Sequence, residues 1–414
     1  MSSINRTTRR QVLAGGIGLV GVGSAMPNYM MRSALAAPKA TESGRVVVVL
    51  QLSGGHDAMS ELVPHGVPEY HKLRTTTRIT EEQVIKINDQ LGLHPNLKGF
   101  KQLLDEGSFA AIPGVGYPNP NYSHFTATNI WQVADRRGRQ IPHGWIGRAC
   151  DHVFKGNRDP KLTIAVGTGK APLAIKGGEH PGLSFNNPES WRYTGDRGNK
   201  TRLAAYRQLN KMRLDKAKGD LAFVTQTAVN ANESSDQIRE MAKAYKSKVE
   251  YPSTTLSRNL RVIASLVSGG LSTRFYFVTQ GGYDTHRGQR KGHDKLMAEL
   301  NGAIVAFQQD LKQQGHDKRV LLITTSEFGR RVQENGSQGT DHGAAGALYM
   351  FGPGLKAGIH GKHPSLTDLQ GGGGGSLKHT TDFRSIFATV LEKWLGCPSE
   401  PVLGEKYPLI DCIA

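Results

Sequence analysis

The sequence has few cysteines and, beyond its N-terminus, no long apolar run. Only 3 of its 414 residues are cysteine, Cys150, Cys397 and Cys412, and their spacing matches no metal-binding motif. An exported protein can hold one disulfide, for which Cys397 and Cys412 are nearest in sequence, but the odd number leaves the pairing open. No later segment has the roughly 20 apolar residues that a spanning helix needs, so we expect no stable membrane span.

Acidic residues are also scarce, because 35 Asp and Glu stand against 52 Lys and Arg, a formal net charge of +17. Such a surplus favours anionic partners, among them phosphorylated or sulfated compounds, envelope polymers and nucleic acid. A basic, solvated surface without a specific partner explains the composition equally well. The sequence has no recognisable nucleic-acid-binding motif, and we expect no nucleic acid among the partners.

The first 36 residues have the three parts of an export signal. A charged start with Arg9-Arg10 precedes a glycine-rich, weakly apolar stretch, and Ala34-Leu35-Ala36 is a small-residue cleavage pattern. The paired arginines predict twin-arginine (Tat) export, with the Tat translocon as a transient partner. The apolar stretch is too short for a membrane anchor. We therefore expect a periplasmic or secreted mature protein.

Alternating strands and helices predict an α/β fold. Runs typical of buried strands occur at 45–52, 109–115, 274–280, 319–325 and 347–351, and helical patterns occur near 95–106, 294–314 and 383–395. This order predicts a mostly parallel central sheet with helices on both faces, in one domain from 42 to 412. The polar, basic segment 186–250 is predicted to be a helical insertion or cap on that domain.

Polar side chains follow four of these strands at the point where each strand ends. In chain order they are Asp57, Ser123 with His124, Asp284 with His286, and Glu327. Ligands of such sheets bind beyond the carboxyl ends of the strands. The sequence therefore predicts an active site at this edge.

Asp284 and His286 stand two apart in an extended, glycine-flanked segment, so both can face one divalent ion. Such ligands suit zinc, manganese or iron, whereas a mainly carboxylate set suits calcium. The alternative is a turn in which Asp284 accepts backbone hydrogen bonds. The other candidate metal ligands are Asp57, Glu327, Asp341 and His342. Three of them have an ordinary structural alternative: a strand-to-loop turn for Asp57, an ion pair with an arginine for Glu327, and an acceptor that fixes an imidazole for Asp341. The Asp-His-Gly sequence around His342 is by itself a weak signal.

Ser123 is the candidate nucleophile, because a serine beside a cation can lose its proton and attack phosphorus or sulfur. It lacks the G-x-S-x-G elbow of α/β-hydrolases, and a structural hydroxyl is the alternative. His124 belongs to the same candidate catalytic set, although its adjacency makes it a poor base for Ser123. Arg330 is a candidate for holding an anionic group in a bidentate manner, together with Arg148 and Arg331.

Five motifs together resemble the exported bacterial proteins grouped as domain-of-unknown-function family 1501. They are QLSGGHD at 51–57, SHF at 123–125, GGYDTH at 281–286, SEFGRR at 326–331 and GTDHG at 339–343. That family is placed in the alkaline phosphatase superfamily, beside sulfatases and cofactor-independent phosphoglycerate mutases. The resemblance implies an alkaline-phosphatase-like fold. It also implies that Asp57, Asp284, His286 and His342 are metal ligands and that Ser123 is at the nucleophile position.

Two departures from the superfamily pattern leave the number of metal ions open. Asp284 and His286 are two apart where the superfamily usually has a spacing of four, and Glu327 follows a serine where an Asp-His pair is usual. One or two ions, or none, are compatible with this pattern.

The sequence thus predicts an exported, metal-dependent hydrolase of a phosphate or sulfate ester. The nucleophile is Ser123 or a metal-activated water, and the substrate is an anionic small molecule or envelope polymer. The alternative is a non-catalytic periplasmic protein that binds polyanions, cell-wall material or a partner protein.

Overall fold

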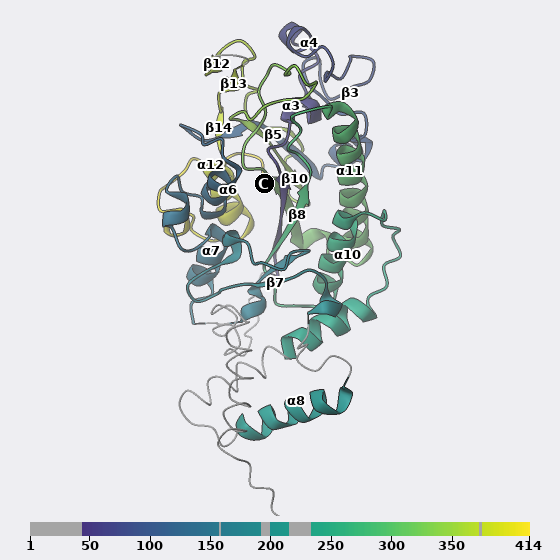
Figure 1. Ribbon diagram of the computed structural model, residues 1–414, viewed down its shortest axis with the longest axis vertical. Helices are drawn as coiled ribbons and strands as arrows, with labels where there is room; N and C mark the ends of the chain where they lie inside the picture. The colour runs from purple at the N-terminus through teal and green to yellow at the C-terminus, as the bar shows by residue number, and fades with distance from the viewer. Residues whose placement is uncertain (1–43, 157–158, 192–198, 215–232, 372–374) are drawn as a thin grey trace, which may run out of the picture.

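The computed structural model describes residues 44–156, 159–191, 199–214, 233–371 and 375–414, so the predicted export signal lies outside the described residues. A mixed nine-stranded sheet forms the centre (Figure 1). Its strands are β1 (Val46–Ser53), β5 (Phe109–Gly116), β6 (Thr163–Val166), β7 (Leu183–Phe185), β8 (Phe275–Gly281), β9 (Val320–Thr325), β10 (Gly346–Phe351), β11 (Gly358–Ile359) and β14 (Thr381–Asp382). Their order is β11-β5-β10-β9-β1-β8-β6-β7, with β14 paired to β5.

Most neighbouring strands are parallel. β1 pairs in parallel with β8 and β9, and β6 pairs in parallel with β8 and β7. β10 is antiparallel to both β9 and β5, so β5 points in the same direction as β9. The strands β1, β5, β8 and β9 therefore end at one edge, and β10 begins there. The predicted mostly parallel sheet is confirmed.

The alternation of side chains along β1 fills two cores. Val48 and Leu50 belong to the core on one face of the sheet, and Val47 and Val49 belong to the core on the other face. This period of two places each apolar residue of a central strand against helices on one side or the other. A continuous β-branched run therefore forms a strand that is buried on both faces.

Helices cover both faces of the sheet (Figure 1). The first core is covered by α5 (Lys98–Asp105), α10 (Thr255–Ser268) and α11 (Gln289–Gln313). The second is covered by α6 (His124–Val133), α7 (Trp145–Val153) and α12 (Phe383–Thr389). A π-helical turn, η6 (Val390–Trp394), continues α12 through the rest of the segment predicted at 383–395. The predicted two-sided helical covering is confirmed.

Short elements surround the edge where β1 ends (Figure 1). They are α3 (Ala58–Glu61), α4 (Pro68–Leu73), a small sheet of β2 (Leu62–Val63), β4 (Gly92–Leu93) and β3 (Ile85–Lys86), and the pair β12 (Leu369–Gln370) and β13 (Ser376–Leu377). Elsewhere lie η1 (Gly138–Gln140), η2 (Pro160–Leu162), η3 (Leu173–Ile175), η5 (Asp317–Arg319) and α13 (Glu400–Leu403).

The segment 186–250 contains η4 (Pro188–Ser190), α8 (Lys200–Leu214) and a helix at 233–244, while 192–198 and 215–232 lie outside the described residues. Its role as a cap stays a prediction. The three cysteines are buried and free, so the structure contains no Cys397–Cys412 disulfide. In the part of the chain that the structure describes, no helix combines the length and the apolar character needed to cross a membrane.

Candidate metal centre

Three side chains from separate segments meet beyond the carboxyl edge of the sheet. His124 begins α6 after β5, Asp284 follows β8, and His342 precedes β10. One ligand atom from each lies within 4.8 Å of the other two. Within the described ranges these residues form the one group of three or more such side chains with the spacing of a metal site.

The carboxylate of Asp284 lies at the centre of this group. Nε2 of His342 and Nε2 of His286 are each 3.1 Å from its Oδ1 atom. Nε2 of His124 is 3.5 Å from its Oδ2 atom. The Nε2 atoms of His286 and His342 are 3.0 Å apart. His124, Asp284 and His342 thus direct ligand atoms toward one small volume, and Nε2 of His286 lies beside Asp284 and His342.

The other nitrogen of each imidazole, Nδ1, is held by an oxygen acceptor. The pairs are His124 with Oε1 of Glu327 at 2.9 Å, His286 with Oδ1 of Asp341 at 3.0 Å, and His342 with the Tyr122 carbonyl at 2.9 Å. Carbonyl and carboxylate oxygens accept hydrogen bonds, so each Nδ1 donates its proton. A neutral ring then carries its lone pair on Nε2, which is how ligating histidines are oriented in metal sites.

The close Nε2 atoms of His286 and His342 test whether a metal fits. Two lone pairs at 3.0 Å repel each other unless a cation or a shared proton lies between them. Two tetrahedral zinc ligands with Zn–N distances of about 2.0–2.1 Å lie roughly 3.3 Å apart. Burial lowers the pKa of His342 below its ordinary value, which favours the neutral ring. The residues present therefore fit a divalent ion with nitrogen and oxygen ligands.

The two carboxylates of the centre are held in their ionised form. Burial raises the pKa of Asp284, but the Arg330 guanidinium, together with the neighbouring imidazoles of His342 and His286, outweighs this effect and brings it to about 2. Hydrogen bonds from Asn335 and His286 lower the pKa of Asp341. Both groups are negatively charged at neutral pH, as a metal centre requires.

Arg330 and Arg148 hold the protein backbone. The buried Arg330 guanidinium donates to the carbonyl oxygens of Gly54, Gly55, Tyr283 and Thr340, and to Oδ1 of Asp284 at 2.6 Å. Arg148 donates to three backbone carbonyl oxygens, those of Val133, His143 and Val402. Of the three arginines considered for an anionic group, Arg331 is the one that lines the open depression beside the centre.

The structure does not bring Asp57 into the group. Its buried carboxylate forms an ion pair with Arg74 and accepts hydrogen bonds from Ser60, at 2.6 Å, and from Gln289. Burial raises the pKa of Asp57, but the Arg74 guanidinium outweighs burial and holds it well below its usual range. The charge of the Asp57 carboxylate is therefore compensated by Arg74, Ser60 and Gln289, which are not members of the group of imidazoles.

Ser123 occupies the exposed N-cap position of α6, directly before His124. Its backbone N–H donates to Oδ1 of Asn121 at 2.8 Å, and its hydroxyl does not cap the helix. The N-terminal end of a helix favours negative charge. Ser123 thus directly precedes His124, a member of the group, and its hydroxyl does not serve as the helix cap.

Two glycines allow these loops to approach one another. Gly54 has a φ of +126°, and a Cβ there would lie 2.4 Å from the backbone nitrogen of Asp284. A Cβ on Gly339 would lie 2.2 Å from the carbonyl carbon of His286. Only glycine fits at such distances, which explains the glycines at these two positions of the motifs at 51–57 and 339–343.

An open depression of about 890 Å³ lies beside the centre. It is lined by Tyr122, His286, Arg331, Asp341, His342, Gln370, Gly371, Gly375 and Ser376. Imidazole, guanidinium, amide and hydroxyl groups share this lining with the Asp341 carboxylate, and the mixture suits a polar ligand. The candidate metal centre thus borders an open depression.

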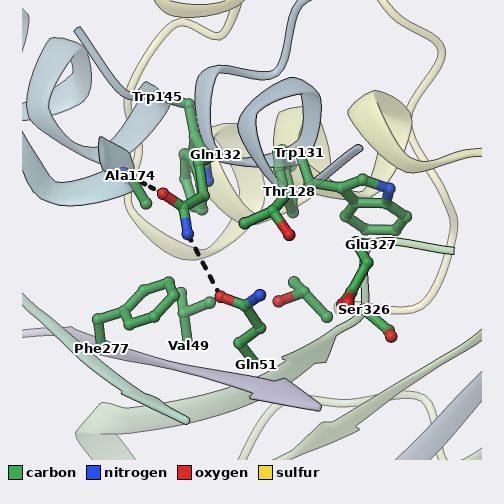
Figure 2. A pocket seen from close by; sticks show the side chains of 12 residues that line it. Val49, Gln51, Thr128, Trp131, Gln132, Trp145, Ala174, Phe277, Ser326 and Glu327 are labelled. Atoms are coloured by element: carbon green, nitrogen blue, oxygen red, sulfur yellow. Dashed lines mark hydrogen bonds between the residues drawn. The ribbon is translucent and has the colours of Figure 1, made fainter. Parts of the chain in front are cut away.

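A second, smaller cavity is lined by Glu327 and lies between α6 and the sheet (Figure 2). In it, Gln132 donates to Gln51 and accepts from the Ala174 N–H, both at 3.3 Å. The cavity has room for about one water molecule. Oε2 of Glu327 is buried without a hydrogen-bond partner among the described residues.

Several contacts of the centre had no signal in the sequence. The Tyr122 contact uses a backbone carbonyl, which any residue can supply. Asn335 donates to Oδ1 of Asp341 at 3.0 Å and to the His286 carbonyl at 2.9 Å. Gln289, the first residue of α11, joins three segments through one amide. Each of these contacts depends on the folded arrangement of distant segments.

The fold has low-similarity counterparts among solved structures. A sulfatase from Pseudoalteromonas sp., PsFucS1, is 13% identical with a TM-score of 0.34, and the match covers 78% of this chain and 66% of that chain. An alkaline phosphatase superfamily protein from Vibrio parahaemolyticus is 10% identical with a TM-score of 0.35, covering 91% and 78%. The alkaline phosphatase of the Antarctic bacterium TAB5 is 12% identical with a TM-score of 0.30, covering 76% and 93%. All three TM-scores are below 0.5, so the functional argument rests on the residues of this chain.

A search of curated proteins found no match. The sequence profile of one family, described as "Protein of unknown function (DUF1501)", matches residues 44–395. This match spans most of the chain and includes all five motifs from which the resemblance was inferred. The chain belongs to the DUF1501 family.

Proposed function

We propose that this protein is a metal-dependent hydrolase of a phosphate or sulfate ester. One observation carries the proposal: three imidazole Nε2 atoms surround the Asp284 carboxylate while every Nδ1 donates to an oxygen. A purely structural cluster does not need all three rings oriented in this way. Nitrogen-rich ligand sets of this kind favour zinc, with manganese or iron as the next candidates.

His124, Asp284, His286 and His342 would hold the ion. When bound, a divalent ion polarises the ester and stabilises the negative charge that develops on the transferred group. Glu327 and Asp341 keep the ring protons of His124 and His286 at Nδ1. The other ring nitrogen of each imidazole, Nε2, thereby stays available to bind the ion.

The depression would receive the anionic part of the substrate. Arg331 lines it and supplies the positive charge that can hold non-bridging oxygens. Ser123, at the N-terminal end of α6, is our proposed nucleophile, and a metal-activated water is its alternative. Tyr122 and Gln370 line the same depression, where they would contact the leaving group of the ester.

The direct test is hydrolysis of p-nitrophenyl phosphate and p-nitrocatechol sulfate by the mature chain loaded with zinc or manganese. We expect one of the two esters to be hydrolysed. A chelator should stop this hydrolysis, and added metal should restore it. Asp284→Ala should abolish it, whereas His152→Ala, an exposed position on α7, should not. Stoichiometric metal binding without turnover of either ester would instead favour a polyanion-binding protein.

We also propose that the protein works outside the cytoplasm, because Arg9-Arg10 and Ala34-Leu35-Ala36 form a Tat signal. Replacing both arginines with lysine in the full chain should retain the precursor inside the cell. Fractionation of cells that express the two forms measures this. Equal amounts of both mature forms in the periplasm would contradict Tat export.

A further inference from the structure

The buried side-chain amide of Gln289 contacts the two loops that carry ligands of the candidate metal centre. Oε1 of Gln289 accepts a hydrogen bond from Oγ1 of Thr285 at 2.9 Å and another from Oγ1 of Thr340 at 2.6 Å. Thr285 is the residue between the ligands Asp284 and His286. Thr340 stands two residues before His342. A single carbonyl oxygen therefore joins the two loops that carry these ligands.

The other end of the amide is fixed to the start of α3, which follows β1. Nε2 of Gln289 donates to Oδ2 of Asp57 and, at 3.4 Å, to Oγ of Ser60. Asp57 is in turn held by the buried guanidinium of Arg74. A carboxylate only accepts and a hydroxyl has one proton to donate, so this network allows one orientation of the amide. Gln289, Asp57, Arg74 and Thr340 are each at most 1% exposed.

The backbone repeats the same connection between the two loops. The N–H of Thr340 donates to the carbonyl of Thr285 at 3.0 Å, and the N–H of Gln289 donates to the carbonyl of Gln338 at 2.8 Å. The side-chain amide adds the link to Asp57, which no backbone bond supplies. Gln289 thus joins the loops that carry Asp284, His286 and His342 without a hydrogen bond to any of these three side chains.

We propose that Gln289 is a positioning residue that sets the ligand spacing of the metal centre, and that Asp57 acts through it rather than as a ligand. The inference rests on the proposed metal-dependent function. A centre whose ligands are already in place binds its ion without the cost of ordering two loops. The removal of one hydroxyl from the junction, meaning the hydrogen bonds of the Gln289 amide, should therefore reduce the favourable free energy of metal binding more than the free energy of unfolding.

Thr340 offers the cleanest test, because valine has the shape of threonine without its hydroxyl and serine keeps the hydroxyl. We expect Thr340→Val to raise the zinc dissociation constant about 10–100-fold, as do changes to groups that orient metal ligands. Thr340→Ser should bind zinc like the wild type. Titration against a competing chelator measures the constants, and thermal unfolding of the metal-free proteins measures stability alongside.

Ile304→Val is the matched control for a general loss of stability. Ile304 is fully buried in the same helix, α11, and contacts the core on one face of the sheet. The Ile304→Val substitution should lower the unfolding temperature without changing the zinc dissociation constant. Gln289→Leu, which removes both ends of the junction, should weaken zinc binding at least as much as Thr340→Val.

The outcomes separate this inference from the proposed function. If the wild type binds zinc and Thr340→Val and Gln289→Leu bind it equally well, the positioning role is wrong and the metal centre stands. If the wild type binds no zinc, manganese or iron, the proposed function is wrong, and the positioning role fails with it.

Discussion

Oε1 of Glu327 accepts a hydrogen bond from Nδ1 of His124 at 2.9 Å, while Oε2 of the same buried carboxylate has no partner among the described residues. The Gly54 N–H also donates to Oε1, at 2.8 Å. An unpartnered, buried carboxylate oxygen destabilises a fold. The presence of a glutamate at position 327 is therefore explained by its contact with the His124 imidazole rather than by a contribution to the stability of the fold.

Glu327→Gln should separate these two effects. We expect the zinc dissociation constant to rise about 10–100-fold, because the amide is a weaker acceptor for His124. The metal-free protein should unfold at the same temperature as the wild type or a higher one, since a buried charge is removed. Chelator competition and calorimetry measure the two effects. Unchanged zinc affinity would show that Glu327 does not orient His124.

Ser123→Ala should abolish turnover but not metal binding. If Oγ of Ser123 is the nucleophile, we expect kcat to fall by roughly 10³-fold or more. The hydroxyl does not cap α6, so the unfolding temperature should stay close to that of the wild type. Steady-state hydrolysis of p-nitrophenyl phosphate and zinc content are the measurements. A variant with near-normal kcat would identify a metal-activated water as the nucleophile.

The neighbouring arginines 330 and 331 should behave differently. Arg330 is fully buried among four carbonyl oxygens and Asp284, so Arg330→Ala should cost about 3 kcal/mol or more of unfolding free energy. Arg331 lines the depression, so Arg331→Ala should leave stability within about 1 kcal/mol and raise KM. Urea unfolding and ester hydrolysis test both changes. The reverse pattern would contradict these assignments.

Acid should unfold the protein partly through Glu61. Burial raises the pKa of this carboxyl, but attraction to the imidazoles of His56 and His293 and a hydrogen bond with His56 outweigh burial and bring it to about 2, against an ordinary value of 4.5. A pKa lowered by folding means that ionised Glu61 stabilises the protein above about pH 4.5, and that this stabilisation is lost as the pH falls through about 2.

Glu61→Gln should remove this part of the acid sensitivity. We expect the variant to be less stable than the wild type at neutral pH, because His56 loses the carboxylate 2.7 Å from its Nδ1 atom. Between pH 4.5 and 2 its stability should fall less steeply than that of the wild type. Urea midpoints across this range give the slopes. Two parallel curves would show that Glu61 does not titrate with unfolding.

The sequence predicted the strands well because their signal is local. The run Val46–Leu52 has the β-branched, continuously apolar pattern of a strand buried on both faces, and the structure has β1 there. It also predicted that polar residues after several strands would meet, because parallel strands end at one edge. The structure accordingly brings His124, Asp284, His286 and His342 together.

The remaining features depend on long-range contacts. Nothing near Asp57 in sequence indicates that Arg74 would neutralise it, because the pairing requires the loop after α4 to fold back. Arg330 has the same residue type as Arg331, and only the packing of Gly54 and Tyr283 around it decides which of the two is buried. The antiparallel direction of β10 likewise follows from its pairing with β5 and β9.

Elemental analysis tests the central claim most directly. The protein should be purified without chelators, beside Asp284→Ala/His286→Ala and His152→Ala variants. We predict near-stoichiometric zinc, manganese or iron in the wild type and in His152→Ala, and none in the double variant, because two of the converging ligands are gone. A wild type that is free of metal and takes up none of these added ions would contradict the account.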